Sequence, residues 1–139
     1  GRARTFHVKT ANAQTVFEIM HDNVHNSTEI HTDESRIYGP VKDNYSRHHT
    51  VMHSGNEYVR YEGERTVHTN TVEGYFSVFK RGMKGTYQHC AEKHLHRYLA
   101  EFDFRYNNRS KLGVEDAERA AKAINGIEGK RLTHNQTAV

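Results

Sequence analysis

The chain has 139 residues, the size of one domain, and its 35% hydrophobic and 27% charged residues make it polar for a globular protein. It contains no apolar run near the ~18 residues of a membrane span. Its one cysteine, Cys90, excludes an internal disulfide and a cysteine-based zinc site, and it fits a reducing, cytoplasmic setting. The net charge of +3 is uneven: residues 1–67 carry 8 Lys/Arg against 9 Asp/Glu, residues 68–139 carry 12 against 8, and the basic surplus of the second half favours a polyanionic partner.

The beginning of the chain is predicted to form a strand, a helix and a second strand. The residues of Arg2–Lys9 alternate between two sides, as in a strand. Asn12–Val24 places its apolar residues on one helical face, and Thr28–Thr32 is a short strand-like run that ends at Asp33. This order predicts a parallel pair of strands. Ligands of such sheets bind at the carboxyl ends of the strands, where Asp33 lies.

The middle of the chain is predicted to be less regular. Glu34–Tyr38 forms one helical turn, which Gly39 and Pro40 are expected to break. The composition of His48–His53 predicts a further strand. Ser54–Arg65 is polar and marked by glycine, and Tyr58 and Tyr61 are expected to pack locally there.

The second half is predicted to be helical. A first long helix covers Asn70–Arg81, a basic loop follows at Gly82–Gly85, and a second helix covers His89–Asn107 with a core-facing apolar stripe. Val114–Ile124 is a short alanine-rich helix, and residues 127–139 are predicted to form a loose tail.

One face of the first long helix is polar. Because each residue of a helix advances by 100°, Asn70, Glu73, Ser77 and Lys80 share that face. An amide oxygen, a carboxylate and a cation together could ligate a hard metal ion and steady a phosphate. The same Asn70 and Glu73 also match a helix-start pattern, with a cap and a back-reaching carboxylate, and spacing alone favours that interpretation.

Twelve histidines raise the question of a zinc site. The candidate pairs are His48 with His49, and His94 with His96. Neither pair has the i,i+4 spacing of two ligands on one helical face, and no cysteine or HExxH pattern accompanies them. A zinc site is therefore the less favoured interpretation.

Several motifs in order resemble one enzyme family. Residues 68–88, HTNTVEGYFSVFKRGMKGTYQ, and residues 93–109, KHLHRYLAEFDFRYNNR, resemble the C-terminal half of insertion-sequence transposases of the ISXO-like group. Residues 31–39, HTDESRIYG, resemble the block of that family that carries its second catalytic aspartate, and residues 51–63, VMHSGNEYVRYEG, resemble the linker between the two blocks. The resemblance covers the chain from about Arg2 to Arg109.

The resemblance implies an α/β fold, namely an incomplete ribonuclease H-like catalytic core of the DDE type. Residues 1–109 would be the C-terminal part of that catalytic domain, and residues 110–139 a short helix and a tail. Such enzymes perform transposition, a DNA recombination reaction in which Mg²⁺ (or Mn²⁺) supports cutting and joining of transposon-end DNA. The partners implied are transposon-end and target DNA and further copies of the chain in a transposition complex, with no membrane.

The resemblance also assigns candidate site residues. Asp33 matches the second metal ligand, although a helix cap before Arg36 would be an ordinary use of the same side chain. For the third ligand, Asn70 stands where the ISXO-like transposases often have asparagine in place of the usual glutamate. Glu73, one turn on, is the chemically stronger ligand. Both therefore stay open as the third ligand. Lys80 would contact substrate phosphate.

The lesser candidates for DNA contact are Arg81, Lys84 and His68.

In this fold the first catalytic aspartate lies on a first strand, which would precede Gly1. Nothing in residues 1–21 replaces it, because that stretch has no aspartate. We therefore expect the 139-residue chain alone not to cut DNA. Two alternatives remain at this point: a non-catalytic nucleic-acid-binding module and a histidine-rich metal-binding protein.

Overall fold

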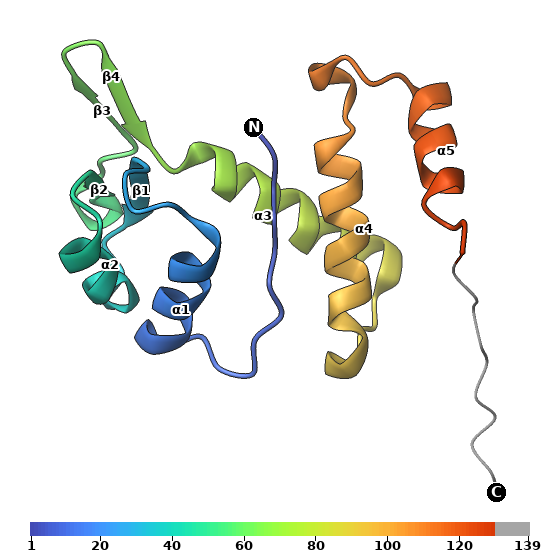
Figure 1. Ribbon diagram of the computed structural model, residues 1–139, viewed down its shortest axis with the longest axis horizontal. Helices are drawn as coiled ribbons and strands as arrows, with labels where there is room; N and C mark the ends of the chain where they lie inside the picture. Colours follow the sequence, from blue (N-terminus) through green and yellow to red (C-terminus); the bar gives the residue numbers. More distant parts are fainter. Residues whose placement is uncertain (130–139) are drawn as a thin grey trace, which may run out of the picture. The chain divides into compact units, whose positions relative to one another are not determined.

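Helices and four short strands alternate along residues 1–129, the part of the chain that the computed structural model describes (Figure 1). The mixture is compatible with the predicted α/β class. The chain divides into two units, one formed by Phe6–His96 and the other by Gly1–Thr5 with Arg97–Val139. In the described part, no helix has both the length and the apolar character needed to cross a membrane.

A parallel strand pair lies at the centre of the Phe6–His96 unit. Strand β1, Ile30–Asp33, pairs with β2, His48–Val51, in a register that sets Ile30 opposite His48 and Asp33 opposite Val51. Both strands were predicted to within two residues of their observed ends. The helix α2, Gly39–Asn44, lies in the connection between them, as a parallel pair requires a crossover.

The helix α1, Ala13–Asn23, completes the core on one side of this pair (Figure 1). Its predicted start is confirmed, because the side chain of Asn12 accepts the backbone N–H of Thr15 at 2.9 Å. The hydroxyl of Tyr45 donates to the carbonyl oxygen of Val24 at 3.1 Å, so this buried side chain has its polar end satisfied. The core consists of Ile30, Val41 and Tyr45, with Val16, Met20, Val24 and Tyr38 packed against it.

The segment Gly39-Pro40 begins a helix instead of ending one. The 3₁₀ turn η1, Arg36–Tyr38, runs directly into α2, and Pro40 lies in the first turn of that helix. The predicted break was wrong because proline lacks an N–H and has a fixed φ, which a first helical turn accepts without loss.

An antiparallel hairpin, which was not predicted, lies in and after the polar, glycine-marked stretch. Strand β3, Val59–Glu62, pairs with β4, Arg65–His68, across a two-residue turn. Gly63 in that turn has φ +62°, a conformation that glycine adopts without strain. Of this hairpin, Val67 is fully buried. The sequence hid the hairpin because charged residues share a face with the buried Val67 and its strands are only four residues long.

The predicted first strand at Arg2–Lys9 was wrong. No strand forms within those residues. In the second unit the side-chain amide of Asn107 instead accepts the N–H of Ala3 at 2.6 Å and donates to its carbonyl at 2.8 Å. The carboxylate of Asp103 accepts both the N–H and the hydroxyl of Thr5. Side chains of a helix thus satisfy backbone groups that a neighbouring strand would have satisfied.

The remaining helices agree with prediction in type and differ at their ends. They are α3, Asn70–Gly82; α4, Leu95–Asn107; and α5, Asp116–Asn125, with the 3₁₀ turns His53–Gly55, Glu92–His94 and Ser110–Leu112. The expected loop after α3 continues as a π-helical turn, Met83–Tyr87, and α4 begins later than expected. Of the predicted tail, residues 130–139 lie outside the described residues.

We expect Val51→Ala to lower the free energy of unfolding by about 2 kcal/mol. The valine is fully buried, and the change removes two methyl groups and leaves a cavity. Val72→Ala is the matched control, because that side chain is 49% exposed on α3 and should change stability by less than about 0.5 kcal/mol. Urea unfolding of both variants measures the difference, and equal decreases would contradict the assignment of Val51 to the core.

Candidate active site

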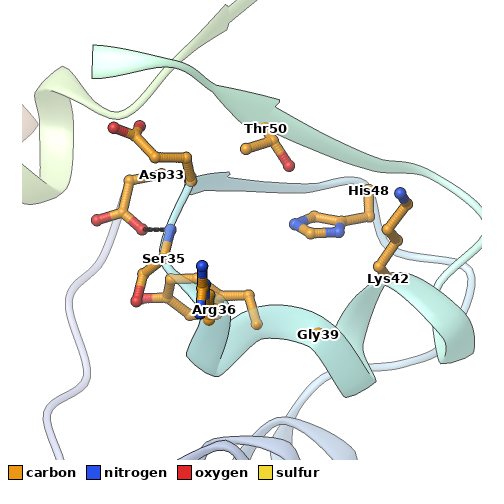
Figure 2. Close-up of a pocket in the computed structure, with 9 residues that line it drawn as sticks. Asp33, Ser35, Arg36, Gly39, Lys42, His48 and Thr50 are labelled. Atoms are coloured by element: carbon orange, nitrogen blue, oxygen red, sulfur yellow. Dashed lines mark hydrogen bonds between the residues drawn. The ribbon is translucent and has the colours of Figure 1, made fainter. Parts of the chain in front are cut away.

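Asp33 lies at the carboxyl end of β1, as the sequence predicted. Its carboxylate is half-buried, and Oδ1 accepts the backbone N–H of Ser35 at 3.0 Å (Figure 2). Ser35, not Asp33, occupies the cap position of the following turn at Arg36–Tyr38. Asp33 therefore closes a local turn with one oxygen, and it retains a second carboxylate oxygen for other chemistry.

The neighbouring residue Glu34 holds the loop that follows β2. Its two carboxylate oxygens accept the backbone N–H groups of His53 and Ser54, at 2.8 Å and 2.9 Å. These two hydrogen bonds stabilise the ionised carboxylate and are the main reason why the pKa of Glu34 is lowered; the bond from Ser54 contributes most. The ends of β1 and β2 are thereby fastened to each other beyond their last paired residues.

His53 continues this connection to the start of α3. Its Nε2 lies 3.0 Å from the hydroxyl of Thr69 and 3.0 Å from Oε1 of Glu73, and the Thr69 hydroxyl donates to the same carboxylate. A continuous set of hydrogen bonds thus joins the residue after Asp33 to Glu73. Ligands of one metal must lie close together, so the assignments of Asp33, Asn70 and Glu73 predict that Asp33 approaches the first turn of α3. The connection through His53 is consistent with that prediction.

The start of α3 decides between two interpretations of its polar residues. Thr69 occupies the cap position, and Asn70 is the first helical residue and is exposed. The interpretation of Asn70 as the cap was therefore wrong. Glu73 does reach back, but to the side chain of Thr69. Asn70 keeps an exposed amide, and Oε1 of Glu73 already accepts a hydrogen bond from Thr69.

The predicted DNA contacts gather at the other end of α3. Lys80 and Arg81 lie exposed in its last turn, and Lys84 is exposed in the π-helical turn that follows. Ten residues of helix separate Lys80 from Asn70, which corresponds to about 15 Å along the axis. Lys80 can therefore contact a phosphate that lies away from the start of the helix. The fourth candidate, His68, ends β4 and is half-buried.

The oxygen donors do not by themselves complete a metal site. Among residues 1–129, no group of three His, Cys, Asp or Glu side chains is arranged so that it could hold a metal ion. Asp33 has the hard oxygen chemistry that Mg²⁺ prefers, but a stable site needs several such ligands around one point.

The pair His48 and His49 cannot hold a zinc ion either. His48 and His49 are consecutive in β2, so their side chains point to opposite faces of the sheet. His49 lies against Glu29 and Glu62, at 3.8 Å and 3.6 Å, while His48 lies against Thr32. Two ligands on opposite faces of a sheet cannot bind one ion.

A pocket of about 170 Å³ lies beside Asp33, on the face of β2 that carries His48 and Thr50 (Figure 2). The turn at Arg36–Tyr38 and the first residues of α2 form its other wall. Its lining residues are Asp33, Glu34, Ser35, Arg36, Tyr38, Gly39, Lys42, His48 and Thr50.

The family model of the ISXO2-like transposase domain matches residues 1–107 of the chain. The chain belongs to that family. No curated protein and no solved structure matches it. The resemblance of the motifs is thus confirmed at the level of the family, and the transposase domain belongs to a class of enzymes that act on DNA.

Sequence reasoning missed several residues around the Asp33 end of the transposase domain. Glu34 and His53 connect β1 to α3, while Arg36, Lys42 and His48 line the pocket. The position of Glu34 directly after Asp33 was the available signal. The lining of the pocket was hidden because it depends on α2, which was not predicted.

The transposase domain should lose stability as the pH falls below about 4.5, and Glu34→Gln should weaken that dependence. The folded state lowers the pKa of Glu34 below its unfolded value of 4.5, so its ionised carboxylate stabilises the fold at pH values above 4.5. This stabilisation is lost as the pH falls through the pKa of the folded state. Glu64→Gln, in the exposed turn of the hairpin, is the control. Urea midpoints between pH 3 and pH 7 measure the effect, and parallel curves for Glu34→Gln and the unchanged chain would refute it.

Proposed function

We propose that this chain carries a DDE-type catalytic domain with a ribonuclease H-like core, which cuts and joins transposon-end DNA. Family membership over residues 1–107 is the observation that carries the proposal. The parallel pair β1–β2 supports it, because it delivers Asp33 at the carboxyl end of a strand, the usual place for functional groups in parallel sheets.

Asp33 is the metal ligand that we propose with the strongest support. It is half-buried, it is oriented by the N–H of Ser35, and it borders a pocket. Asn70 and Glu73 remain the alternatives for a ligand from α3. The exposed amide of Asn70 is available in the present structure. Glu73 uses Oε1 toward Thr69 and His53, which leaves Oε2 as the oxygen that could bind a metal.

Mg²⁺ or Mn²⁺ is the proposed cofactor, since both take oxygen ligands from carboxylates and amides. A complete site needs more carboxylate ligands than Asp33 provides. The proposal therefore concerns which residues of this chain contribute to the site.

DNA is the proposed substrate, and further copies of the chain are proposed partners in a transposition complex. The basic residues at the end of α3 and in the turn after it support DNA binding through phosphates. Self-association is supported by the short sheets, because each strand pairs on one side only within residues 1–129 and unpaired strand edges favour association. The cytoplasmic setting that Cys90 favours stays a prediction.

In the transposase that carries this domain, Asp33→Asn should abolish Mg²⁺-dependent nicking of transposon-end DNA while DNA binding persists. The asparagine keeps the size of the side chain and its hydrogen-bond acceptor for Ser35, and removes the negative charge that a metal requires. The 139-residue chain alone should bind DNA and leave it uncut. If that chain nicks DNA and Asp33→Asn abolishes the nicking, another of its acidic residues completes the site. Undiminished nicking by Asp33→Asn in the transposase would overturn the assignment.

Replacing Lys80, Arg81 and Lys84 together with alanine should weaken binding to any DNA sequence. Interactions with phosphates carry no sequence information, and the removal of each one should reduce the slope of log affinity against log salt by about 1. Fluorescence anisotropy with two unrelated duplexes measures both quantities. Alanine at Lys9, Lys93 and Lys111, which are equally charged and exposed, is the control. Identical results for the two triple variants would mean that the end of α3 is a solvated surface.

A further inference from the structure

Two basic side chains border the Asp33 pocket without an acidic partner. Arg36 and Lys42 are exposed at the wall that the turn η1 and the helix α2 form (Figure 2). Neither forms an ion pair or a hydrogen bond within residues 1–129, whereas Arg60, Arg65 and most glutamates of this unit are paired. Two unpaired cations at one hollow indicate a place where an anion would be stabilised.

His48 supplies a third polar group with an unmet requirement. The hydroxyl of Thr32 donates its one proton to the carbonyl of Asp33 at 2.9 Å, so its hydrogen bond with Nε2 of His48 at 2.8 Å requires that nitrogen to be the donor. Nδ1 of His48 is buried and has no hydrogen-bond partner within residues 1–129. A buried nitrogen without a partner costs free energy, which rotation of the imidazole toward a phosphate in the pocket would recover.

The electrostatics at His48 point in the same direction. Burial is the main cause that lowers the pKa of His48, and the positive charges of His49, Lys42 and His31 add to it. An anion beside Lys42 would offset part of this effect and allow His48 to become a charged donor. A phosphate offers several acceptor oxygens to such donors.

The carboxylate of Asp33 also lines the pocket, away from Lys42 and His48 (Figure 2). Glu34 also lines the pocket, but the backbone N–H groups of His53 and Ser54 already occupy its oxygens. The pocket volume of about 170 Å³ is well above the space that a single water needs. The hollow thus combines basic groups suited to a phosphate with a carboxylate suited to a metal on that phosphate.

We propose that this pocket binds one phosphate of the DNA strand, held by Arg36, Lys42 and His48. The inference rests on the proposed function, because it takes DNA as the substrate of the Asp33 site. It adds a phosphate-binding position separate from the basic residues at the end of α3. It also gives a role to residues that no catalytic assignment includes.

The first experiment measures DNA affinity of the 139-residue chain with Arg36→Gln and Lys42→Gln combined. EDTA is present throughout, so the result does not depend on the metal ligands or on nicking. We expect affinity for a short duplex to fall about tenfold and the salt slope to fall by about 1, as when one phosphate is no longer neutralised. The conservative exchange of Arg36→Lys with Lys42→Arg should restore most of the affinity.

The matched control combines Lys9→Gln with Lys93→Gln, which removes the same charge from exposed positions of the same unit. Circular dichroism checks that all variants fold. If the pocket variant and the control bind DNA equally, the pocket is not a phosphate site and the inference is overturned. That outcome leaves the proposed function intact, since Asp33→Asn tests it separately.

The second experiment follows the imidazole of His48 by ¹⁵N NMR during a pH titration of the unchanged chain. Adding the duplex should raise the pKa of His48, and inorganic phosphate at the same phosphate concentration should have a smaller effect. No change with the duplex would overturn the inference. A change with inorganic phosphate alone would also overturn it, because the pocket would then be a site for free phosphate.

Discussion

The carboxylate of Glu34 determines how the parts around Asp33 are joined. By accepting two consecutive backbone N–H groups, it fixes the loop after β2. That loop presents His53 to Thr69 and Glu73, where α3 begins. The hairpin before α3 also contacts β2, through Arg60 on the carbonyl of Thr50 and Glu62 beside His49. Glu34 adds a second connection, which joins a strand end, a loop and a helix start.

The same arrangement explains why the role of Glu73 is harder to assign than that of Asp33. Asp33 uses one oxygen in a local turn. Oε1 of Glu73 accepts a hydrogen bond from the threonine that caps its own helix and lies 3.0 Å from the imidazole of a histidine in another loop. Glu73 therefore already has a structural use, and its Oε2 is the oxygen that could bind a metal, while Asn70 could take part through its exposed amide.

The sequence predicted what depends on local pattern and failed where tertiary contacts decide. The helices α1 and α3 and the strands β1 and β2 follow from periodicity, and the position of Asp33 follows from them. The hairpin at Gly63 was hidden by short charged strands, and α2 by a proline that begins a helix. The pocket residues could not be found, because His48 and Lys42 meet only through the crossover. The family was recognisable from motifs, which depend on residue order and not on packing.

The pairing of Asn107 with Ala3 has a consequence for how the chain tolerates change. The amide of Asn107 bonds the backbone N–H and carbonyl of residue 3, not its side chain. Nearly any residue other than proline can offer those two groups, whereas only an amide side chain both donates and accepts in this way. Selection on this pairing would therefore fall on one end only. The residue at position 3 can change without loss of these two hydrogen bonds, as long as position 107 keeps its amide.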